Sequence, residues 1–292
     1  MRALLIHNPT AGSGRYTRDE LLGHLDKAGF TTRYVTIEGE AYKDALAEGD
    51  AEIVIVAGGD GTVAKIARNM PNRKMLLFIL PVGTANNVAR SLAIEGEIAA
   101  LVANLQGAPE RRLNVGCVSG PWGTWNFLES VGWGALAQVV DTGVTNHSSE
   151  EEIARGRELF ADTLEAAVAS HVSFDIDGHT IEGDFIFVEI LNIGMTGPRV
   201  MISPSAEPGD GLLDIVFLPA ARKQEMIDWL RSDPDETPIP LTEIKAKAAT
   251  LHWREGPLRI DDEVFDAPEH ETDVCVEIEP HGLHVCVPVI ED

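Results

Sequence analysis

The N-terminal part of the chain alternates between short apolar runs and segments of helical length, and this alternation restricts the fold more than any other feature. The apolar runs lie at residues 2–7, 31–37, 52–59 and 74–81. Strands covered on both faces are continuously apolar, and a repeated βα order is typical of a parallel sheet with helices on both sides. The sequence therefore predicts a doubly wound parallel sheet here.

The second part of the chain has a different pattern. Shorter strand-like runs are separated by turn signals such as Asp177-Gly178, which is typical of an antiparallel sandwich, and one helix is expected at 148–170. We thus predict an α/β plus β protein with two domains. Residues 1–113 would form the N-terminal doubly wound parallel-sheet nucleotide domain, and residues 114–292 a C-terminal antiparallel β-sandwich domain.

Charge narrows the range of partners. The chain has 23 basic and 47 acidic side chains, a net charge of −24. The whole excess of acidic side chains lies after residue 113, where there are 34 acidic and 10 basic side chains. Attraction to nucleic acid and to anionic lipid is carried by Lys and Arg. The balance therefore argues against a nucleic-acid partner and allows at most peripheral membrane contact.

Signals for export or membrane insertion are not evident in the sequence. No apolar run approaches the roughly 20 residues that a bilayer-spanning helix needs, and the apolar start ends at Asn8. Cys117, Cys275 and Cys286 form no C-x-x-C pair, which fits a reduced compartment and neither a disulfide framework nor a zinc site. We expect a cytoplasmic protein.

Three loops rich in glycine or asparagine, at residues 8–14, 58–62 and 81–87, each follow a predicted strand. Such loops meet at the carboxyl edge of a parallel sheet, and bare backbone amides beside a helix N-terminus suit phosphate. The loops match neither the P-loop nor G-x-G-x-x-G. Asp60 lies among them, which makes sense if a metal ion accompanies the phosphate or if the acid holds a hydroxyl or positive group of the ligand. Capping the following helix is the simpler alternative.

Five motifs in order carry a resemblance to a known family. They are NPTAGSG at 8–14, GGDGTV at 58–63, LPVGTANNVARSL at 80–92, ISPSAEPGDGLLDIVFL at 202–218 and LRIDDEVF at 258–265. Together they resemble the diacylglycerol kinase catalytic-domain family of bacterial soluble lipid kinases, which is related to sphingosine kinases and more remotely to NAD kinases. The resemblance runs through nearly the whole chain.

The resemblance implies that ATP and magnesium are the cofactors and that the active site lies in the cleft between an ATP-binding and an acceptor-binding domain. The implied contacts to ATP are Asn8, Pro9, Thr10, Ala11, Gly12, Thr36, Gly58, Gly59, Asp60, Gly61, Thr62, Val63, Ala64, Thr84 and Asn86. Small residues are needed there because a side chain would hold the backbone amides away from the phosphate oxygens.

Two acids have catalytic roles within this resemblance. IDDE at 260–263 matches the family's D-G-E turn, so Glu263 is implied as the base that accepts the proton of the attacking hydroxyl, while Asp60 helps to organise magnesium on the phosphates. Without the resemblance, Glu263 would be one more acid of an acidic domain. Asp262 stands where glycine is usual, which raises the question of a positive φ at that position.

Two further positions depart from the family pattern. Asn87 and Asn114 stand where relatives often have acids. An amide offers hydrogen bonds but no negative charge, so a magnesium network that used these positions would hold the ion more weakly. The departures leave open a non-catalytic nucleotide-binding regulator.

A second, structural magnesium is implied by EPGDGLLD at 207–214. Some relatives hold an ion there through an aspartate side chain and nearby backbone carbonyls, which correspond to Asp210 with Glu207 and Leu212. A plain Asp-Gly turn that leads into the next strand is an equal alternative.

An aromatic group lies where relatives begin the second domain. It consists of Trp122, Trp125, Phe127 and Trp133, and either an acyl-chain site or ordinary core packing would explain it.

These observations predict a phosphotransferase with an alcohol acceptor. ATP would give its γ-phosphate to a lipid alcohol, most simply diacylglycerol; a sphingoid, an acylglycerol, a soluble alcohol, NAD phosphorylation and a non-catalytic role are the alternatives. A homodimer also remains open.

Overall fold

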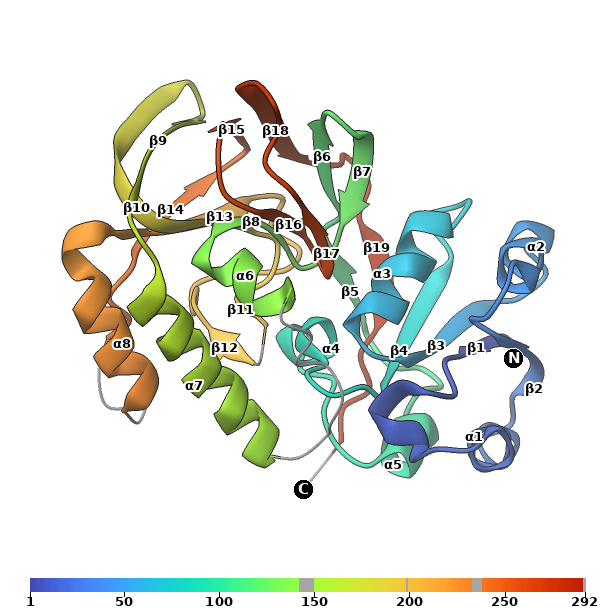
Figure 1. Cartoon of the computed structure of the whole chain (residues 1–292). Helices are drawn as coiled ribbons and strands as arrows, with labels where there is room; N and C mark the ends of the chain where they lie inside the picture. Colours follow the sequence, from blue (N-terminus) through green and yellow to red (C-terminus); the bar gives the residue numbers. More distant parts are fainter. Residues whose placement is uncertain (142–149, 198, 233–237, 291–292) are drawn as a thin grey trace. The chain divides into compact units, whose positions relative to one another are not determined.

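The computed structural model describes residues 1–141, 150–197, 199–232 and 238–290. The chain divides into two compact units (Figure 1). The first contains Met1–Leu113 and the C-terminal segment that begins at His281, and the second contains the described residues between Asn114 and Pro280.

The first unit is built on a six-stranded sheet. Its strands, in spatial order, are β2 (Thr31–Thr36), β1 (Arg2–His7), β3 (Ile53–Gly58), β4 (Leu76–Pro81), β19 (Leu283–Cys286) and β5 (Glu110–Leu113). Neighbouring strands are parallel except for the β19–β5 pair. Every residue of the central strand β3 is buried, as its continuous apolar run predicts, so the parallel α/β fold is confirmed.

The connecting segments of this unit are helical. They are the 3₁₀ turn η1 (Ala11–Gly14) and the helices α1 (Arg18–Lys27), α2 (Ala41–Glu48), α3 (Asp60–Asn69), α4 (Asn87–Ser91) and α5 (Ile98–Ala103). Thr17 and Glu20 close a capping box at the start of α1, because each side chain accepts the other residue's backbone amide. Gly49 ends α2 in the left-handed conformation, with φ +63°.

The last strand departs from the predicted domain range. Residues 114–292 were expected to form one domain, yet β19 pairs in parallel with β4 and antiparallel with β5 of the first unit. The physical reason is that β4 would otherwise have an unpaired edge, and the apolar side chains of Leu283 and Val285, both fully buried, extend the core of that sheet.

The second unit contains an eleven-stranded sheet and a short β-ribbon among its described residues, in agreement with the predicted antiparallel sandwich. The strands of the sheet are β6 (Gly116–Gly120), β7 (Gly123–Phe127), β8 (Ser130–Gly134), β9 (Ser170–Ile176), β10 (His179–Leu191), β13 (Leu213–Pro219), β14 (Thr242–Ala246), β15 (Ala248–Trp253), β16 (Leu258–Ile260), β17 (Glu263–Phe265) and β18 (Thr272–Ile278). The ribbon pairs β11 (Met195–Thr196) with β12 (Val200–Met201).

The long strand β10 organises this unit. Its first half pairs with β9, and its second half pairs with β8 and β13, with a register shift between Phe185 and Phe187. Phe174, Phe185 and Phe217 meet edge-to-face on one side of the sheet, with ring centroids 5.3 to 5.4 Å apart. This aromatic contact fixes the interior of the unit.

Helices cover the other side of β10 and β13. They are α6 (Ala135–Asp141), α7 (Glu150–Ala166) and α8 (Lys223–Arg231), which follows the short turn η2 (Ala220–Arg222). The two longer helices lie side by side (Figure 1), and Arg231 forms ion pairs with Glu158, Asp162 and Glu165 across them. The predicted helix at 148–170 corresponds to α7, but α7 ends at Ala166 and Ser170 already begins β9; residues 148 and 149 lie outside the described residues.

Candidate functional site

The three loops predicted to bind phosphate pack against one another at the carboxyl ends of β1, β3 and β4. The backbone amide of Asn8 donates to the carbonyl of Ala57 at 2.9 Å, and its side-chain Nδ2 donates to Thr62 Oγ1 at 3.1 Å. Asn8 Oδ1 in turn accepts the backbone and side chain of Thr10, at 3.2 and 2.8 Å. The first loop is therefore tied to the second and folded back on itself.

Two glycines allow the loops to come this close. Gly12 has φ +56°, and a Cβ there would lie 2.2 Å from the carbonyl oxygen of Val82 in the third loop. A Cβ on Gly83 would lie 2.3 Å from Cα of Gly59. Real Cβ contacts are never so short, so the three chain segments touch through bare backbone.

Asp60 joins the second loop to the third. It is the first residue of α3, and its Oδ1 accepts the backbone amide of Val88, at the start of α4, at 2.9 Å. Asp60 does not cap α3, whose N-cap residue is Gly59 without a side-chain bond; its carboxylate instead accepts an amide in the first turn of α4, so the helix-capping alternative is not realised. Asn86 braces the same loop: its Oδ1 accepts the amide of Gly83, and its Nδ2 donates to the carbonyls of Pro81 and Gly83.

The remaining predicted ATP contacts lie on the same edge of the sheet. Thr36 ends β2 directly beside His7, and Thr84 belongs to the third loop. His7 was not among the predicted residues, although a histidine at the end of a strand before Asn8 is visible in the sequence. It is 2% exposed, its Nδ1 lies 3.1 Å from the hydroxyl of Tyr34, and burial lowers the pKa of its imidazole.

In the second unit, Glu263 begins β17 and follows a tight hairpin turn. Ile260 on β16 pairs with Glu263, so Asp261 and Asp262 form the two-residue connection. The side chain of Glu263 is exposed. This position suits a base that must reach a hydroxyl group of a bound ligand.

The strained residue of this hairpin is Asp261, where φ is +52°; Asp262 does not have a positive φ. The buried carboxylate of Asp261 accepts the backbone amides of Leu128, at 3.2 Å, and Glu129, at 2.8 Å, and its own amide donates to the carbonyl of Ser130 at 2.9 Å. These bonds hold the turn in the left-handed conformation.

A buried charged network beneath the hairpin was missed by sequence reasoning. Arg259, 1% exposed, donates to Glu189 at 2.9 Å, to Ser130 Oγ at 2.7 Å, to the carbonyl of Asp261 at 2.8 Å and to Thr196 Oγ1. Burial raises the pKa of Glu189, while the Arg259 charge opposes that rise. The network joins the hairpin to β8, β10 and β11.

Asn87 and Asn114, at the positions where the resemblance implies acids, are both buried. Asn114 is 6% exposed; its amide donates to the carbonyl of Pro208 at 2.6 Å, and its carbonyl accepts Nδ2 of Asn192 at 3.0 Å. Asn87 is 1% exposed at the start of α4.

In the loop predicted to bind a structural metal ion, Asp210 contacts the side chain of Lys245. Lys245 Nζ lies 3.1 Å from Asp210 Oδ2, and the amide of Leu212 donates to Asp210 Oδ1 at 2.9 Å. The amide of Asp210 donates to the carbonyl of Glu207 at 3.3 Å. Both oxygens of the implied ligand therefore accept donors from the protein, and the set does not suit a divalent ion. Within the described residues, no three His, Cys, Asp or Glu side chains are arranged to hold a metal.

The aromatic group divides between core and surface. Phe127 and Trp133 are 0% and 4% exposed, whereas Trp122 and Trp125 are partly buried against Phe265, with ring centroids 4.5 and 5.4 Å apart. Phe265 lies on β17, two residues after Glu263.

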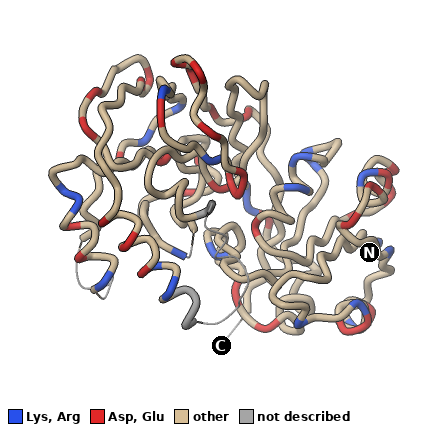
Figure 2. Tube along the Cα trace, in the orientation of Figure 1, with Lys and Arg blue, Asp and Glu red and all other residues tan. Residues whose placement is uncertain are grey.

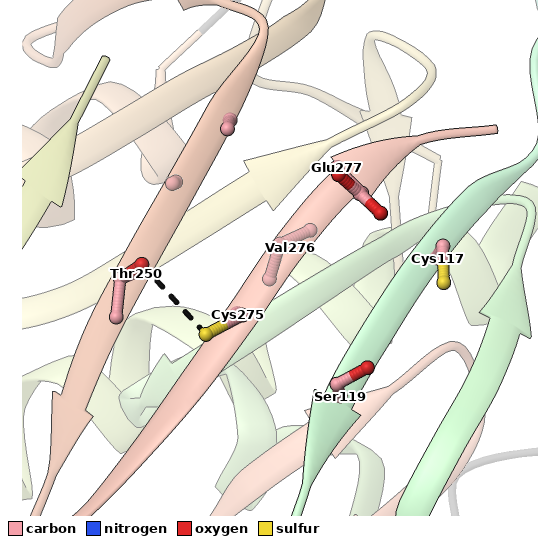
Figure 3. A pocket seen from close by; sticks show the side chains of 8 residues that line it. Cys117, Ser119, Thr250, Cys275, Val276 and Glu277 are labelled. Atoms are coloured by element: carbon pink, nitrogen blue, oxygen red, sulfur yellow. Dashed lines mark hydrogen bonds between the residues drawn. The ribbon is translucent and has the colours of Figure 1, made fainter. Parts of the chain in front are cut away.

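The second unit also has a hollow on its large sheet (Figure 3). Side chains from β6, β15 and β18 line it, among them Cys117, Thr250, Cys275 and Glu277. Burial, aided by nearby acids, raises the pKa of the Cys117 thiol, so that thiol is not activated. None of the predicted site residues lines this hollow.

Two family models match the chain. The model described as the diacylglycerol kinase catalytic domain matches residues 2–118, and the model described as the YegS C-terminal NAD kinase beta sandwich-like domain matches residues 135–285. The chain belongs to the family of proteins that join these two domains, and the predicted relationship is confirmed.

Individual relatives agree with this assignment. The chain is 26% identical to "Diacylglycerol kinase" of Bacillus subtilis (strain 168), over 77% of this chain and 76% of the relative. It is 30% identical to "Probable lipid kinase YegS-like" of Pseudomonas syringae pv. syringae (strain B728a), over 84% and 78%. A diacylglycerol kinase structure from Bacillus anthracis str. Sterne superimposes with a TM-score of 0.72 at 20% identity, over 98% and 96% of the two chains, and supports the fold.

Proposed function

We propose that this protein is an ATP-dependent lipid kinase that transfers the γ-phosphate of ATP to a hydroxyl group of diacylglycerol. Family membership supports the kinase class, and the names of relatives support a lipid acceptor. The observation that carries the nucleotide part is the cluster of three loops, joined by the Asn8–Thr62 and Asp60–Val88 hydrogen bonds. No described helix combines the length and hydropathy needed to cross a bilayer.

The loop cluster fits a triphosphate. Its glycines carry no side chains that would hold a phosphate away from the backbone, and the first amides of α3 have no carbonyl partner within the helix. When bound, magnesium neutralises charge on the phosphates, and Asp60 is the carboxylate in this cluster that would hold it. Asn8, Thr62 and Asn86 keep the loops in place.

The chemical step needs one proton acceptor. The acceptor oxygen forms a bond to the γ-phosphorus, the bond from that phosphorus to the bridging β,γ-oxygen breaks, and the hydroxyl proton passes to Glu263. The products are a phosphomonoester and ADP. Asp261 and Arg259 are buried and hold the hairpin that carries Glu263.

A panel of acceptors tests the proposal. Purified protein is incubated with γ-labelled ATP, magnesium and one of five acceptors: diacylglycerol in mixed micelles, sphingosine, monoacylglycerol, glycerol or NAD. We expect label in phosphatidate. The many Asp and Glu positions along the chain of the second unit (Figure 2) make a water-soluble acceptor the alternative, and label in glycerol phosphate alone would replace the lipid assignment. ATP binding without any transfer would support a regulatory role.

A further inference from the structure

The loop implied to hold a structural magnesium ion already contains a cation. Strands β13 and β14 pair so that Asp214 lies directly opposite Lys245. The ammonium group of Lys245 lies 3.5 Å from Asp214 Oδ1 and 3.1 Å from Asp210 Oδ2. The side chain of Asp214 is 1% exposed and that of Asp210 is 19% exposed. One ammonium group therefore forms ion pairs with two carboxylates that are largely shielded from water.

The rest of the loop is closed by its own hydrogen bonds. Leu212 donates its amide to Asp210 Oδ1, and Asp210 donates its amide to the carbonyl of Glu207. This is an aspartate turn in which the side chain binds the backbone two residues later. Each oxygen of Asp210 is thus used, one by a backbone amide and one by an ammonium group.

A divalent ion bound to Asp210 would have to share its carboxylate with these donors. Magnesium requires oxygen ligands at about 2.0–2.1 Å in near-octahedral geometry. Bound to Asp210, it would lie close to the ammonium group of Lys245, and the two positive charges would repel each other. Loss of Lys245 from the site would also leave the buried Asp214 without its cation.

We propose that Lys245 is the resident cation of the 207–212 loop and takes the place of the structural magnesium implied by the family. The loop is then braced by the protein alone, and its order does not depend on divalent ions. This inference concerns the second unit only and does not rest on kinase activity.

The loop matters because its contacts lead to the Glu263 hairpin. The carbonyl of Pro208 accepts the amide of Asn114, whose carbonyl accepts Nδ2 of Asn192. The same Nδ2 group donates to the carbonyl of Leu128 at 2.8 Å, and the amide of Leu128 binds Asp261. A cation fixed in the chain keeps this series of contacts in place at any magnesium concentration.

Thermal unfolding with and without magnesium tests the inference. Thermal unfolding of the wild-type protein, Lys245→Met and Lys247→Met is measured without nucleotide, in EDTA and in millimolar MgCl₂. Lys247 is the matched control because it is exposed and follows β14 directly. Tryptophan fluorescence reports on the second unit, because all five tryptophans lie between Asn114 and Pro280.

Only Lys245→Met should respond to the ion. In EDTA, its unfolding midpoint should lie about 2–4 °C below that of the wild type. Magnesium should restore the midpoint, since an ion that binds only the folded state raises the stability of that state. Wild type and Lys247→Met should melt at the same temperature in both buffers. The inference would be overturned if magnesium raised the unfolding midpoint of the wild type, or if it left the midpoint of Lys245→Met unchanged.

A second measurement does not depend on the folding of Lys245→Met. Magnesium is titrated into wild type and Asp210→Asn by calorimetry, again without nucleotide. The two titrations should be the same, because Asp210 holds no ion in the wild type. Loss of a binding event in Asp210→Asn would show that Asp210 is a metal ligand and would refute the role of Lys245.

Discussion

Removal of the buried Arg259 charge should destabilise the second unit more than any surface substitution. Arg259→Met removes the cation that pairs with Glu189. Glu189 is 0% exposed and packs so closely on Gly132 that a Cβ on Gly132 would lie 1.9 Å from Glu189 Oε1. The carboxylate therefore has little room to move to water. It either stays charged without its arginine or binds a proton at neutral pH, and both cost free energy.

The size of the effect follows from the contacts that are lost. Arg259 donates to three acceptors at 2.7 to 2.9 Å and lies 3.7 Å from Glu129. Removing one partner of a buried ion pair costs about 3–5 kcal/mol. Replacing both partners removes the uncompensated charge, so Arg259→Met with Glu189→Gln should be more stable than Arg259→Met alone by about 2 kcal/mol.

Urea unfolding followed by tryptophan fluorescence measures these differences. The matched control is Arg254→Met, an exposed arginine on the same unit, which should change the free energy of unfolding by less than about 0.5 kcal/mol. The network does not act as a buried ion pair if Arg259→Met lowers the free energy of unfolding by less than about 1 kcal/mol, or if the double variant is less stable than Arg259→Met alone.

Two further predictions concern loop packing and pH. Gly12→Ala should reduce ATP affinity at least tenfold, because its Cβ would meet the carbonyl oxygen of Val82. Gly39→Ala, also at positive φ but with nothing near its Cβ, should leave ATP affinity unchanged. Equal ATP affinities of the two variants in calorimetry would contradict the close packing of the loops. The carboxylate of Asp273 raises the pKa of His252 in the folded state, so the stabilisation is complete below the unfolded pKa of about 6.5 and is lost as pH rises through the folded value. The free energy of unfolding of the wild type, measured in urea, should therefore fall as pH rises above about 6.5, and that of His252→Gln should fall less; identical pH profiles would exclude this linkage.

Sequence periodicity was sufficient for β1, β3 and β4 of the first unit because their signals are local. Continuous apolar runs gave the parallel strands, and each glycine loop follows one of them. β19 could not be assigned in this way, since four residues of alternating character, such as Leu283–Cys286, fit a sandwich strand equally well. Its partner β4 is about two hundred residues away, and only the fold brings the two together.

Arg259 and Lys245 show why part of the site could not be read from the sequence. Arg259 lies between two apolar residues on β16, and alternation places it on the solvent side, yet all three residues of β16 are buried because both faces of that strand are covered. The role of Lys245 depends on a cross-strand register with Asp214. The positive φ falls at Asp261 because the Ile260–Glu263 pair makes it the first residue of the turn.

Glu263→Gln provides the most direct test of the proposed reaction. The initial rate of label transfer from γ-labelled ATP to diacylglycerol is measured for wild type and variant, with ATP affinity measured on the same samples and Glu269→Gln, an exposed acid of the same unit, as the control. The account predicts a rate at least a hundredfold lower for Glu263→Gln with ATP affinity changed less than twofold, and no change for Glu269→Gln. Full transfer by Glu263→Gln would contradict the assignment of this residue as the base.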